Sequence, residues 1–343
     1  MYVGELWKGG TCLQRMNTLQ DLEHKVLPLD TCSSNVAKKQ KRLIYRIVKK
    51  FIGPMDLAQA NKHIIRSAKC RDIDVLWLDK ALSIKRSTLQ QLKQINPNCA
   101  IVGYSPDDMC GNKKNQSKRF RKHISEYDIY FTTKSFLVGE MQKMGCKKVE
   151  FIDNAYDPEV HKPMQLSEED KKQMGGPVGF IGSWEHERAQ SLFSLAKNEF
   201  QIRVWGDGWE KCKIKHPNLR IEYKPIWGSD YARAICAFDI NLCFLRKANR
   251  DLQTTRSIEI PACGGFMLAE RTTEHLKLFE EAKEAEFFSS DEELLEKAKY
   301  YLSHPQERQR IAIAGRERCM KNGYSNHERL KWMLQIVCES KEK

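Results

Sequence analysis

The sequence predicts an α/β protein with two domains, each built on a parallel β-sheet covered by helices on both faces. Three observations support this prediction. The chain has 343 residues, more than one ordinary hydrophobic core accommodates. Short apolar runs alternate with helical patterns from the first residue onward. That alternation stops after Ile152 and begins again at Val178, so we expect an interdomain connection between them.

The composition is that of a globular protein, because 41% of the residues are hydrophobic and 30% are charged. The opening residues lack the apolar run of a signal peptide. The most hydrophobic stretch, Ile235 to Leu245, is interrupted by Asp239 and is too short to cross a bilayer. We therefore expect a cytoplasmic protein whose membrane contact, if any, is peripheral at the inner face. The 12 cysteines form no C-x-x-C pair, so neither zinc nor a disulfide framework is expected.

The positive charge is concentrated in the front half. Residues 1–166 contain 29 Lys and Arg against 17 Asp and Glu, a net of +12 out of the total of +13. Such a field indicates an anionic partner, which could be a phosphorylated acceptor, an acidic lipid surface or a nucleic acid. A solvated helix face is the alternative for either basic run taken alone. The two runs comprise Lys38, Lys39, Lys41, Arg42, Arg46, Lys49 and Lys50, and Lys113, Lys114, Lys118, Arg119, Arg121 and Lys122.

The periodicity gives four segments. We expect a first domain over 1–155, a linker over 156–176, a second domain over 177–326, and a final helix over 327–343 that packs back on the first domain. A basic amphipathic helix is expected over 35–51. The expected strands cover 2–6, 26–29, 75–78, 101–104, 129–132 and 149–152, then 178–181, 201–205, 219–223, 240–244 and 266–269.

Candidate ligand-binding loops follow the first strand of each domain, because ligands of open parallel sheets bind beyond the carboxyl ends of the strands. Gly9, Gly10 and Thr11 follow the first strand, and Arg15 lies one turn into the next helix. These residues could bind a phosphate or a sugar oxygen, although a tight turn capped by Thr11 is an equal alternative.

In the second domain, Gly182 and Ser183 follow the first strand, and Arg188 comes shortly after. This set could bind a diphosphate through main-chain and hydroxyl donors and a cation. A further loop contains Gly206 and Trp209, but its G-x-G lacks the last glycine of a dinucleotide fingerprint.

Two pairs of acids could perform chemistry. Asp251 and Glu259 stand eight positions apart, and a carboxylate there can accept two hydrogen bonds from the vicinal hydroxyls of a ribose. Asp107 and Asp108 follow the strand over 101–104, where they could orient an acceptor hydroxyl or take its proton. Ordinary solvated acids, a capping role for Asp107 and a divalent-metal site at Asp107 and Asp108 are the alternatives.

The order and spacing of these motifs resemble the CgeB-type glycosyltransferases, relatives of the retaining family 4 enzymes. The matching stretches cover nearly the whole chain. The resemblance implies the GT-B fold, in which two Rossmann-like domains face each other across a cleft. The stretches are the Gly9-Gly10-Thr11 loop, Tyr104 to Met109, Thr132 to Ser135, Asn154 to His161, Gly182-Ser183 with Arg188, Val204 to Trp209, and Arg256 to Phe266.

The resemblance also implies roles for individual residues. Glu259 occupies the place of the acid that holds the ribose of the donor, and Asp251 that of the acid that touches the donor sugar. The family has Glu at that first position, so the shorter Asp251 departs from the pattern. Arg188 and Arg256 would offset the diphosphate charge. The other residues assigned to the donor are Gly9, Gly10, Thr11, Gly182, Ser183, Gly206, Trp209, Tyr223, Pro225, Ile226 and Thr255.

The implied reaction is transfer of a sugar, of the hexosyl kind, from a UDP- or GDP-sugar to an acceptor hydroxyl, with retention and without a metal or another cofactor. Asp107, Asp108, Asp251 and Arg188 are the catalytic candidates, and Arg15 joins the first two as an acceptor-binding candidate. His123 is expected on the surface rather than as the base. The alternatives are a GT-B binding or coat protein without turnover, and a transferase with a nucleic-acid acceptor.

Overall fold

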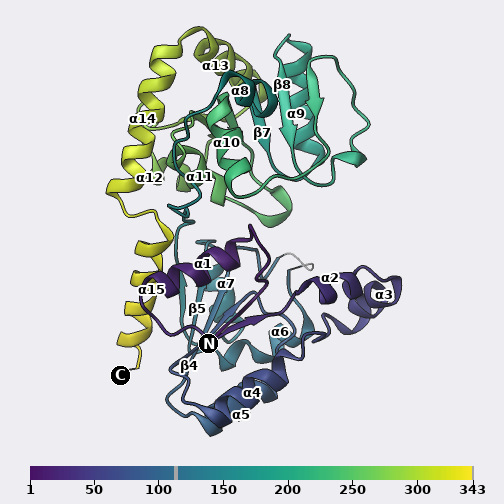
Figure 1. The fold of residues 1–343 in the computed structure, drawn as a ribbon, viewed down its shortest axis with the longest axis vertical. Helices are drawn as coiled ribbons and strands as arrows, with labels where there is room; N and C mark the ends of the chain where they lie inside the picture. The colour runs from purple at the N-terminus through teal and green to yellow at the C-terminus, as the bar shows by residue number, and fades with distance from the viewer. Residues whose placement is uncertain (112–114, 342–343) are drawn as a thin grey trace. The chain divides into compact units, whose positions relative to one another are not determined.

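The computed structural model describes the chain except for residues 112–114 and 342–343 (Figure 1). Lys113 and Lys114 of the second basic run lie outside the described residues, as does the side chain of Arg46. The chain divides into two compact units. The first contains residues 1–153 and 326–343, and the second contains residues 154–325.

The first unit is built on six parallel strands in the order β2-β1-β3-β4-β5-β6. The order reverses between β1 and β3, which pair directly although β2 lies between them in sequence. β4 is buried along its whole length, as expected of a strand covered on both faces. The strands are β1 (Tyr2–Gly4), β2 (Pro28–Asp30), β3 (Val75–Asp79), β4 (Ala100–Ser105), β5 (Ile129–Thr132) and β6 (Val149–Phe151).

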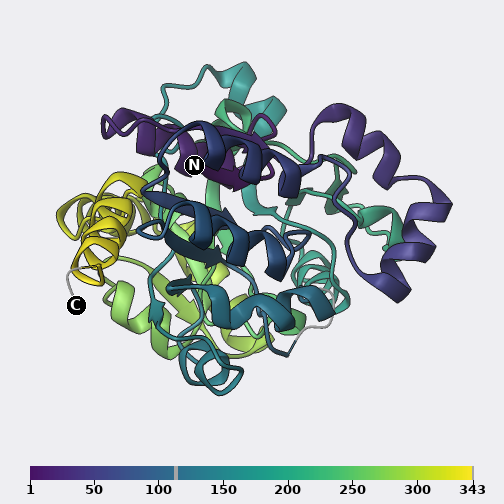
Figure 2. The same cartoon turned by 90° about the horizontal axis from the view of Figure 1, so that it is seen from below.

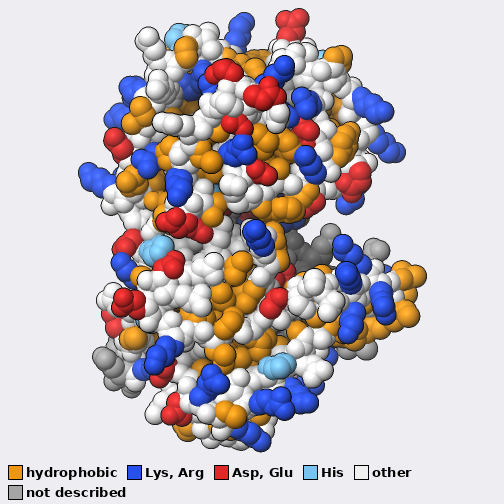
Figure 3. Space-filling model, viewed as in Figure 1, with side chains coloured by type: hydrophobic (Ala, Val, Ile, Leu, Met, Phe, Trp, Pro, Cys, Tyr) orange, Lys and Arg blue, Asp and Glu red, His pale blue; other side chains and the backbone are white. Residues whose placement is uncertain are grey.

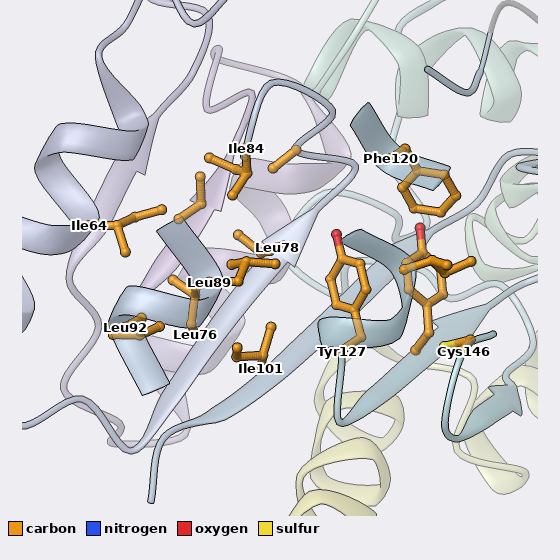
Figure 4. Packing of buried hydrophobic residues seen from close by; sticks show 14 of the residues in the cluster. Ile64, Leu76, Leu78, Ile84, Leu89, Leu92, Ile101, Phe120, Tyr127 and Cys146 are labelled. Carbon is orange, nitrogen blue, oxygen red and sulfur yellow. The ribbon is translucent and has the colours of Figure 1, made fainter. Parts of the chain in front are cut away.

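Alternate residues of these strands enter two different cores, one on each face of the sheet. Leu76, Leu78 and Ile101 pack with α4, α5, α6 and α7 (Figure 4). Trp77 and Val102 point the other way and pack with α1 and α15. The helices are α1 (Thr11–Asp21), α2 (Ser34–Gln40), α3 (Leu43–Ile52), α4 (Ala60–Cys70), α5 (Arg86–Ile95), α6 (Lys118–His123), α7 (Leu137–Lys143) and α15 (Asn326–Glu339), and η1 (Ile124–Glu126) is a 3-10 turn.

Two expectations for this unit were wrong. The basic helix expected over 35–51 is two helices, because Arg42 adopts an extended backbone and begins a new helix as its N-cap. His123 is buried rather than on the surface, since α6 turns it toward the aromatic rings of Phe120 and Tyr127. Burial lowers the pKa of His123 to about 4.

The second unit is also built on six parallel strands, in the order β12-β11-β10-β7-β8-β9. Here the order reverses between β7 and β10. The predicted α/β class with two parallel sheets is confirmed. The strands are β7 (Gly176–Ile181), β8 (Ile202–Trp205), β9 (Leu219–Ile221), β10 (Phe238–Cys243), β11 (Met267–Glu270) and β12 (Glu286–Phe288).

Helices cover this second sheet with one core on each face. Residues 156–176, expected as a linker, lie within this unit and contain α8, whose Ser167 and Asp170 form a capping box. The helices are α8 (Glu168–Met174), α9 (His186–Lys197), α10 (Ser229–Ala237), α11 (Thr255–Ala262), α12 (Thr273–Leu278), α13 (Asp291–Ser303) and α14 (Pro305–Lys321), and η2 (Trp209–Lys211) and η3 (Lys247–Asn249) are 3-10 turns. Among the described residues, no helix combines the length and the apolar composition that a bilayer crossing requires.

The last helix, α15, completes the core of the first unit, although about 170 residues of the second unit precede it in sequence. Leu330, Met333 and Val337 are buried in the cluster that contains Tyr2 and Trp77. Their spacing of three and four residues places them on one face of the helix. Figure 2 shows this helix in yellow, along its own axis.

We expect Leu330→Ala to lower the free energy of unfolding of the first unit by about 2–5 kcal/mol, the usual cost of such a cavity. Gln335→Ala, on the exposed side of the same helix, should change it by less than about 0.5 kcal/mol. Denaturant titration followed by tryptophan fluorescence compares the two variants. Equal stability of both would show that α15 adds nothing to this core.

Candidate functional site

The strand reversal of the second unit brings two loops together at the carboxyl edge of its sheet. The loop after β7 leads into α9, and the chain leaving β10 passes through Phe244 toward α11. Because consecutive connections leave such a switch point toward opposite faces, a crevice for ligands remains between them. Arg188 and Arg256 lie here.

Arg188 is held by main-chain carbonyls. Its Nη1 donates to the carbonyl oxygen of Ser183 at 3.0 Å, and its Nη2 donates to that of Phe244 at 3.3 Å. The guanidinium lies 5.6 Å from the centre of the Phe180 ring. Only 3% of the residue is exposed, and its Nε has no hydrogen-bond partner among the described residues. A carboxylate oxygen of Glu185 is 3.7 Å from that Nε, but Glu185 also pairs with Arg246 at 3.1 Å.

Arg256 reaches the same place from the first turn of α11. Its Nη2 donates to the Phe244 carbonyl oxygen at 3.0 Å, and its guanidinium lies 5.8 Å from the centre of the Phe180 ring. No carboxylate of the described residues lies within ion-pair distance of it. Burial, and then the neighbouring charge of Arg256, lower the pKa of Arg188 to about 10. Glu185, which Arg188 shares with Arg246, is the one carboxylate of the described residues within ion-pair distance of Arg188, so the positive charge of the two arginines is only partly compensated, which favours an anion.

Hydrogen bonds between the loop after β7 and the loop after β8 hold the backbone beside the arginine pair in place. The Gly182 amide donates to the Trp205 carbonyl oxygen, and the Trp209 indole N–H donates to the Gly182 carbonyl oxygen, each at 2.8 Å. Gly206 has a φ of +154°, and a Cβ there would lie 2.0 Å from the Gly182 carbonyl oxygen, so only glycine fits. Trp209 is fully buried and supports the loop from beneath.

Glu259 lies on α11 and is nearly buried. The Tyr231 hydroxyl donates to its Oε2 at 2.6 Å, and the Nε2 of His161 is 3.7 Å from its Oε1. His161 accepts a hydrogen bond from the Asp157 amide at Nδ1, so its ring proton is on Nε2 and faces the carboxylate. Burial and the Glu259 carboxylate raise the pKa of Tyr231 well above its ordinary value, which keeps this hydroxyl a donor.

The other predicted residues of this unit lie around the switch point. Asp251 accepts from the Arg246 amide at 3.3 Å and from the Asn249 side chain at 2.7 Å, so it closes the loop before α11. Ser183 is exposed, and Thr255 is the first residue of α11. A pocket of about 260 Å³ borders Arg188 and Phe244 but not Arg256 or Glu259.

Tyr223, Pro225 and Ile226 form the loop between β9 and α10. Tyr223 has a φ of +52° and a half-exposed side chain, while Ile226 packs against buried Trp205. The Lys224 carbonyl accepts from the Gly206 amide at 3.0 Å, which ties this loop to the glycine-bearing one. A flat ligand such as a nucleobase could stack on an exposed aromatic ring here.

The first unit has its own pocket, of about 350 Å³, at the reversal between β1 and β3. Arg15 and Asp79 lie at its base, with Arg15 Nη2 2.7 Å from Asp79 Oδ2. Burial alone would lower the pKa of Arg15, but the carboxylate of Asp79 raises this pKa well above its ordinary value. The Tyr2 hydroxyl donates to the same carboxylate at 2.5 Å. This charge is compensated, in contrast with that of the arginine pair.

The predicted acids of the first unit differ in position. Asp107 lines the pocket and forms an ion pair with Lys80. Asp108 is buried outside it, where its Oδ1 accepts from the Cys110 and Gly111 amides at 3.0 and 2.8 Å. Asp108 thus caps a turn, and its carboxylate is covered. In the loop between β1 and α1, Gly10 and Thr11 line the pocket, whereas Gly9 forms a turn with a φ of +92°.

Several residues of both sites were not predicted from the sequence. Asp79 is the last residue of β3 and Asp107 follows β4, so the rule that found Asp107 at the carboxyl end of a strand could have found Asp79. Tyr231 and Phe244 have no local signal, and His161 was included only in the Asn154 to His161 stretch of the resemblance, without a role. Tyr231 reaches the site through a contact that spans 28 residues, and Phe244 through contacts that span 12 and 56 residues.

Comparisons with known proteins agree with this geometry. Residues 188–335 match a family model described as "Glycosyl transferase-like". No curated protein sequence matches the chain. Among solved structures, a glycosyltransferase from Rickettsia africae superposes with a TM-score of 0.66 at 14% identity, covering 98% of this chain and 97% of that one.

Two further structures are also similar. Anabaena HepE, solved with UDP and glucose, gives a TM-score of 0.65 at 11% identity and covers 98% of this chain and 99% of its own. Sucrose-phosphate synthase from Thermosynechococcus elongatus gives 0.63 at 10% identity and covers 98% and 94%. The chain therefore has the GT-B fold, and its residues 188–335 are glycosyl transferase-like in sequence.

Proposed function

We propose that this protein is a glycosyltransferase that moves a sugar from a nucleotide-diphosphate sugar to an acceptor hydroxyl. The observation that supports this most directly is the pair of guanidiniums, Arg188 and Arg256, that meet at the Phe244 carbonyl and the Phe180 ring. Two cations held this close repel each other unless an anion lies between or beside them. A diphosphate supplies that anion.

The arginine pair suits the departing group of such a reaction. When the bond to the sugar breaks, negative charge grows on the diphosphate, and preorganised donors stabilise it without moving. The main-chain bonds to Ser183 and Phe244 hold Arg188 in place before a ligand arrives. The first turn of α11, which contains Thr255 and Arg256, adds amide groups that favour an anion. We assign Arg188 and Arg256 to the leaving diphosphate.

We assign Glu259 to the ribose of the donor. An ionised carboxylate has about four acceptor positions, and the Tyr231 hydroxyl occupies one of them. The remaining capacity can accept hydrogen bonds from two vicinal hydroxyls. Tyr231 and His161 fix the orientation of the carboxylate from behind. Tyr223 and Ile226 would then contact the base, with Asp251 near the sugar.

We further propose a CgeB-type hexosyltransferase that uses UDP- or GDP-sugars, retains the anomeric configuration and needs no metal. The UDP-glucose complex of Anabaena HepE, which shares the fold, favours a uridine donor. The arginine pair provides the positive charge that a metal provides elsewhere. Turnover that persists in EDTA supports metal independence, and turnover that requires added Mg²⁺ or Mn²⁺ contradicts it.

The pocket of the first unit is our candidate for the acceptor. Arg15 and Asp107 line it, and the Asp107 carboxylate could orient or deprotonate a hydroxyl. Asp79 and Tyr2 keep Arg15 in position, which makes the base of the pocket rigid. Asp108, being covered, supports the turn beside it.

The first prediction for the donor site concerns Arg256→Met. We expect the variant to bind UDP or GDP about tenfold or more weakly, because hydrogen bonds to charged groups contribute about 1.5–3 kcal/mol. Without ligand, its melting temperature should not fall, since the replacement removes a partly buried cation that lacks a carboxylate partner. Calorimetry and thermal unfolding measure the two effects. Arg310→Met, a half-exposed site on α14, is the matched control and should change neither.

A variant that binds nucleotide as tightly as the parent would remove Arg256 from the donor site. If Arg256→Met instead melts well below the parent without ligand, the arginine is a structural residue. Either result would contradict the role proposed for the pair.

The second prediction for the donor site compares Glu259→Gln with Tyr231→Phe. The glutamine keeps an acceptor for the Tyr231 hydroxyl but loses the charge, so we expect nucleotide affinity to fall by about tenfold. Tyr231→Phe keeps the Glu259 carboxylate and removes only the hydroxyl that orients it, so nucleotide affinity should fall less than in Glu259→Gln. Affinity for a ribonucleotide and for its 2′-deoxy analogue, measured on each variant, gives the test. A parent protein that does not distinguish the two sugars would show that Glu259 does not hold the ribose.

A further inference from the structure

Helix α3 of the first unit exposes an apolar face. Leu43 is 68% exposed, Ile44 75%, Ile47 50% and Phe51 72%. These residues recur at spacings of three and four, so they share one side of the helix, while buried Tyr45 faces the body of the unit. Large apolar side chains gathered on one exposed helix face mark an interaction surface.

Basic side chains surround this face. Lys38 and Lys39 lie on α2, Lys41 and Arg42 separate the two helices, and Lys49 and Lys50 lie on α3, all exposed. The sequence from Thr31 to Met55 contains no Asp or Glu. Figure 3 shows hydrophobic and Lys or Arg side chains together over α2 and α3, which stand out from the side of the first unit in Figures 1 and 2.

We propose that α2 and α3 dock the protein on an anionic lipid bilayer. A helix that joins a strongly apolar side to a cationic one lies in the interface of a membrane, with its apolar side chains between the acyl chains and its cations near the headgroups. Lysine and arginine beside the surface add attraction to acidic lipids. The proposal is independent of nucleotide binding, which the second unit would perform.

The combination of residues favours a bilayer over other occupants. A nucleic acid would use the lysines but leave Leu43, Ile44, Ile47 and Phe51 in water. A second copy of this chain would bring the same cations against each other, because the symmetric interface of a dimer uses the same patch twice. An anionic bilayer satisfies the apolar and the basic side chains at once.

Docking through this surface would also affect the candidate acceptor pocket. Gln40, Tyr45 and Lys49, which belong to α2 and α3, line that pocket together with Arg15 and Asp107. The docked helices would therefore place the pocket beside the lipid headgroups, where an acceptor attached to the membrane could enter.

The test is cosedimentation of the full chain with vesicles. We expect it to bind vesicles of phosphatidylcholine mixed with phosphatidylglycerol, and to bind vesicles of phosphatidylcholine alone much more weakly. The Ile44→Ser, Phe51→Ser variant should lose binding by about tenfold or more, the scale for two large apolar side chains. Leu276→Ser, Ile313→Ser replaces two apolar side chains of the second unit that are 46% and 52% exposed, and it is the control that should bind like the parent.

Charge is tested separately. Lys38→Gln, Lys39→Gln and Lys41→Gln combined should weaken binding to the acidic vesicles, and so should added salt. Every variant must melt close to the parent, which is expected because all of these side chains are exposed.

Four outcomes would overturn the proposal. The parent could fail to bind the acidic vesicles. The Ile44→Ser, Phe51→Ser variant could bind them as well as the parent, which would show that the apolar face is not used. Size-exclusion chromatography could find a dimer that only this variant dissociates, which would assign the surface to a second copy of the chain. A single-stranded RNA could bind where vesicles do not, which would assign the surface to a nucleic acid.

Discussion

In both units the order of parallel strands reverses once, and the candidate sites depend on that reversal. It lies between β1 and β3 in the first unit and between β7 and β10 in the second. The connections on either side of a reversal run to opposite faces of the sheet, so the carboxyl edge between them stays uncovered by a crossover. Arg15 and Asp79 meet at the first reversal, and Arg188 and Arg256 meet at the second.

The electrostatics of the two reversals differ, and this difference separates the roles of their arginines. Asp79 neutralises Arg15 and raises its pKa, so the charge of Arg15 is balanced within the fold. Burial and Arg256 lower the pKa of Arg188. A buried charge without a full partner costs stability, and proteins keep such groups mainly where a ligand completes them. The second reversal is therefore the stronger candidate for a diphosphate.

Local patterns predicted the two parallel sheets and indicated Gly182 and Arg188, because both come soon after a strand, whereas the family resemblance added Arg256. Other features depend on contacts distant in sequence. The Trp209 indole N–H donates to the Gly182 carbonyl oxygen, and Tyr231 and His161 contact Glu259, although the sequence pattern gave none of these contacts. The helix break at Arg42 was missed because the sequence has no glycine or proline there. The burial of His123 was missed because the residues around it form a polar, basic run.

The central claim is that the arginine pair binds the diphosphate of a nucleotide sugar. A crystal structure of the full chain with a nucleoside diphosphate tests it most directly. We expect phosphate oxygens within hydrogen-bond distance of both guanidiniums, since the Nε atoms of Arg188 and Arg256 have no hydrogen-bond partner among the described residues. We expect the ribose hydroxyls at Glu259. A nucleotide bound elsewhere, with the two arginines unchanged and without phosphate contacts, would contradict the account.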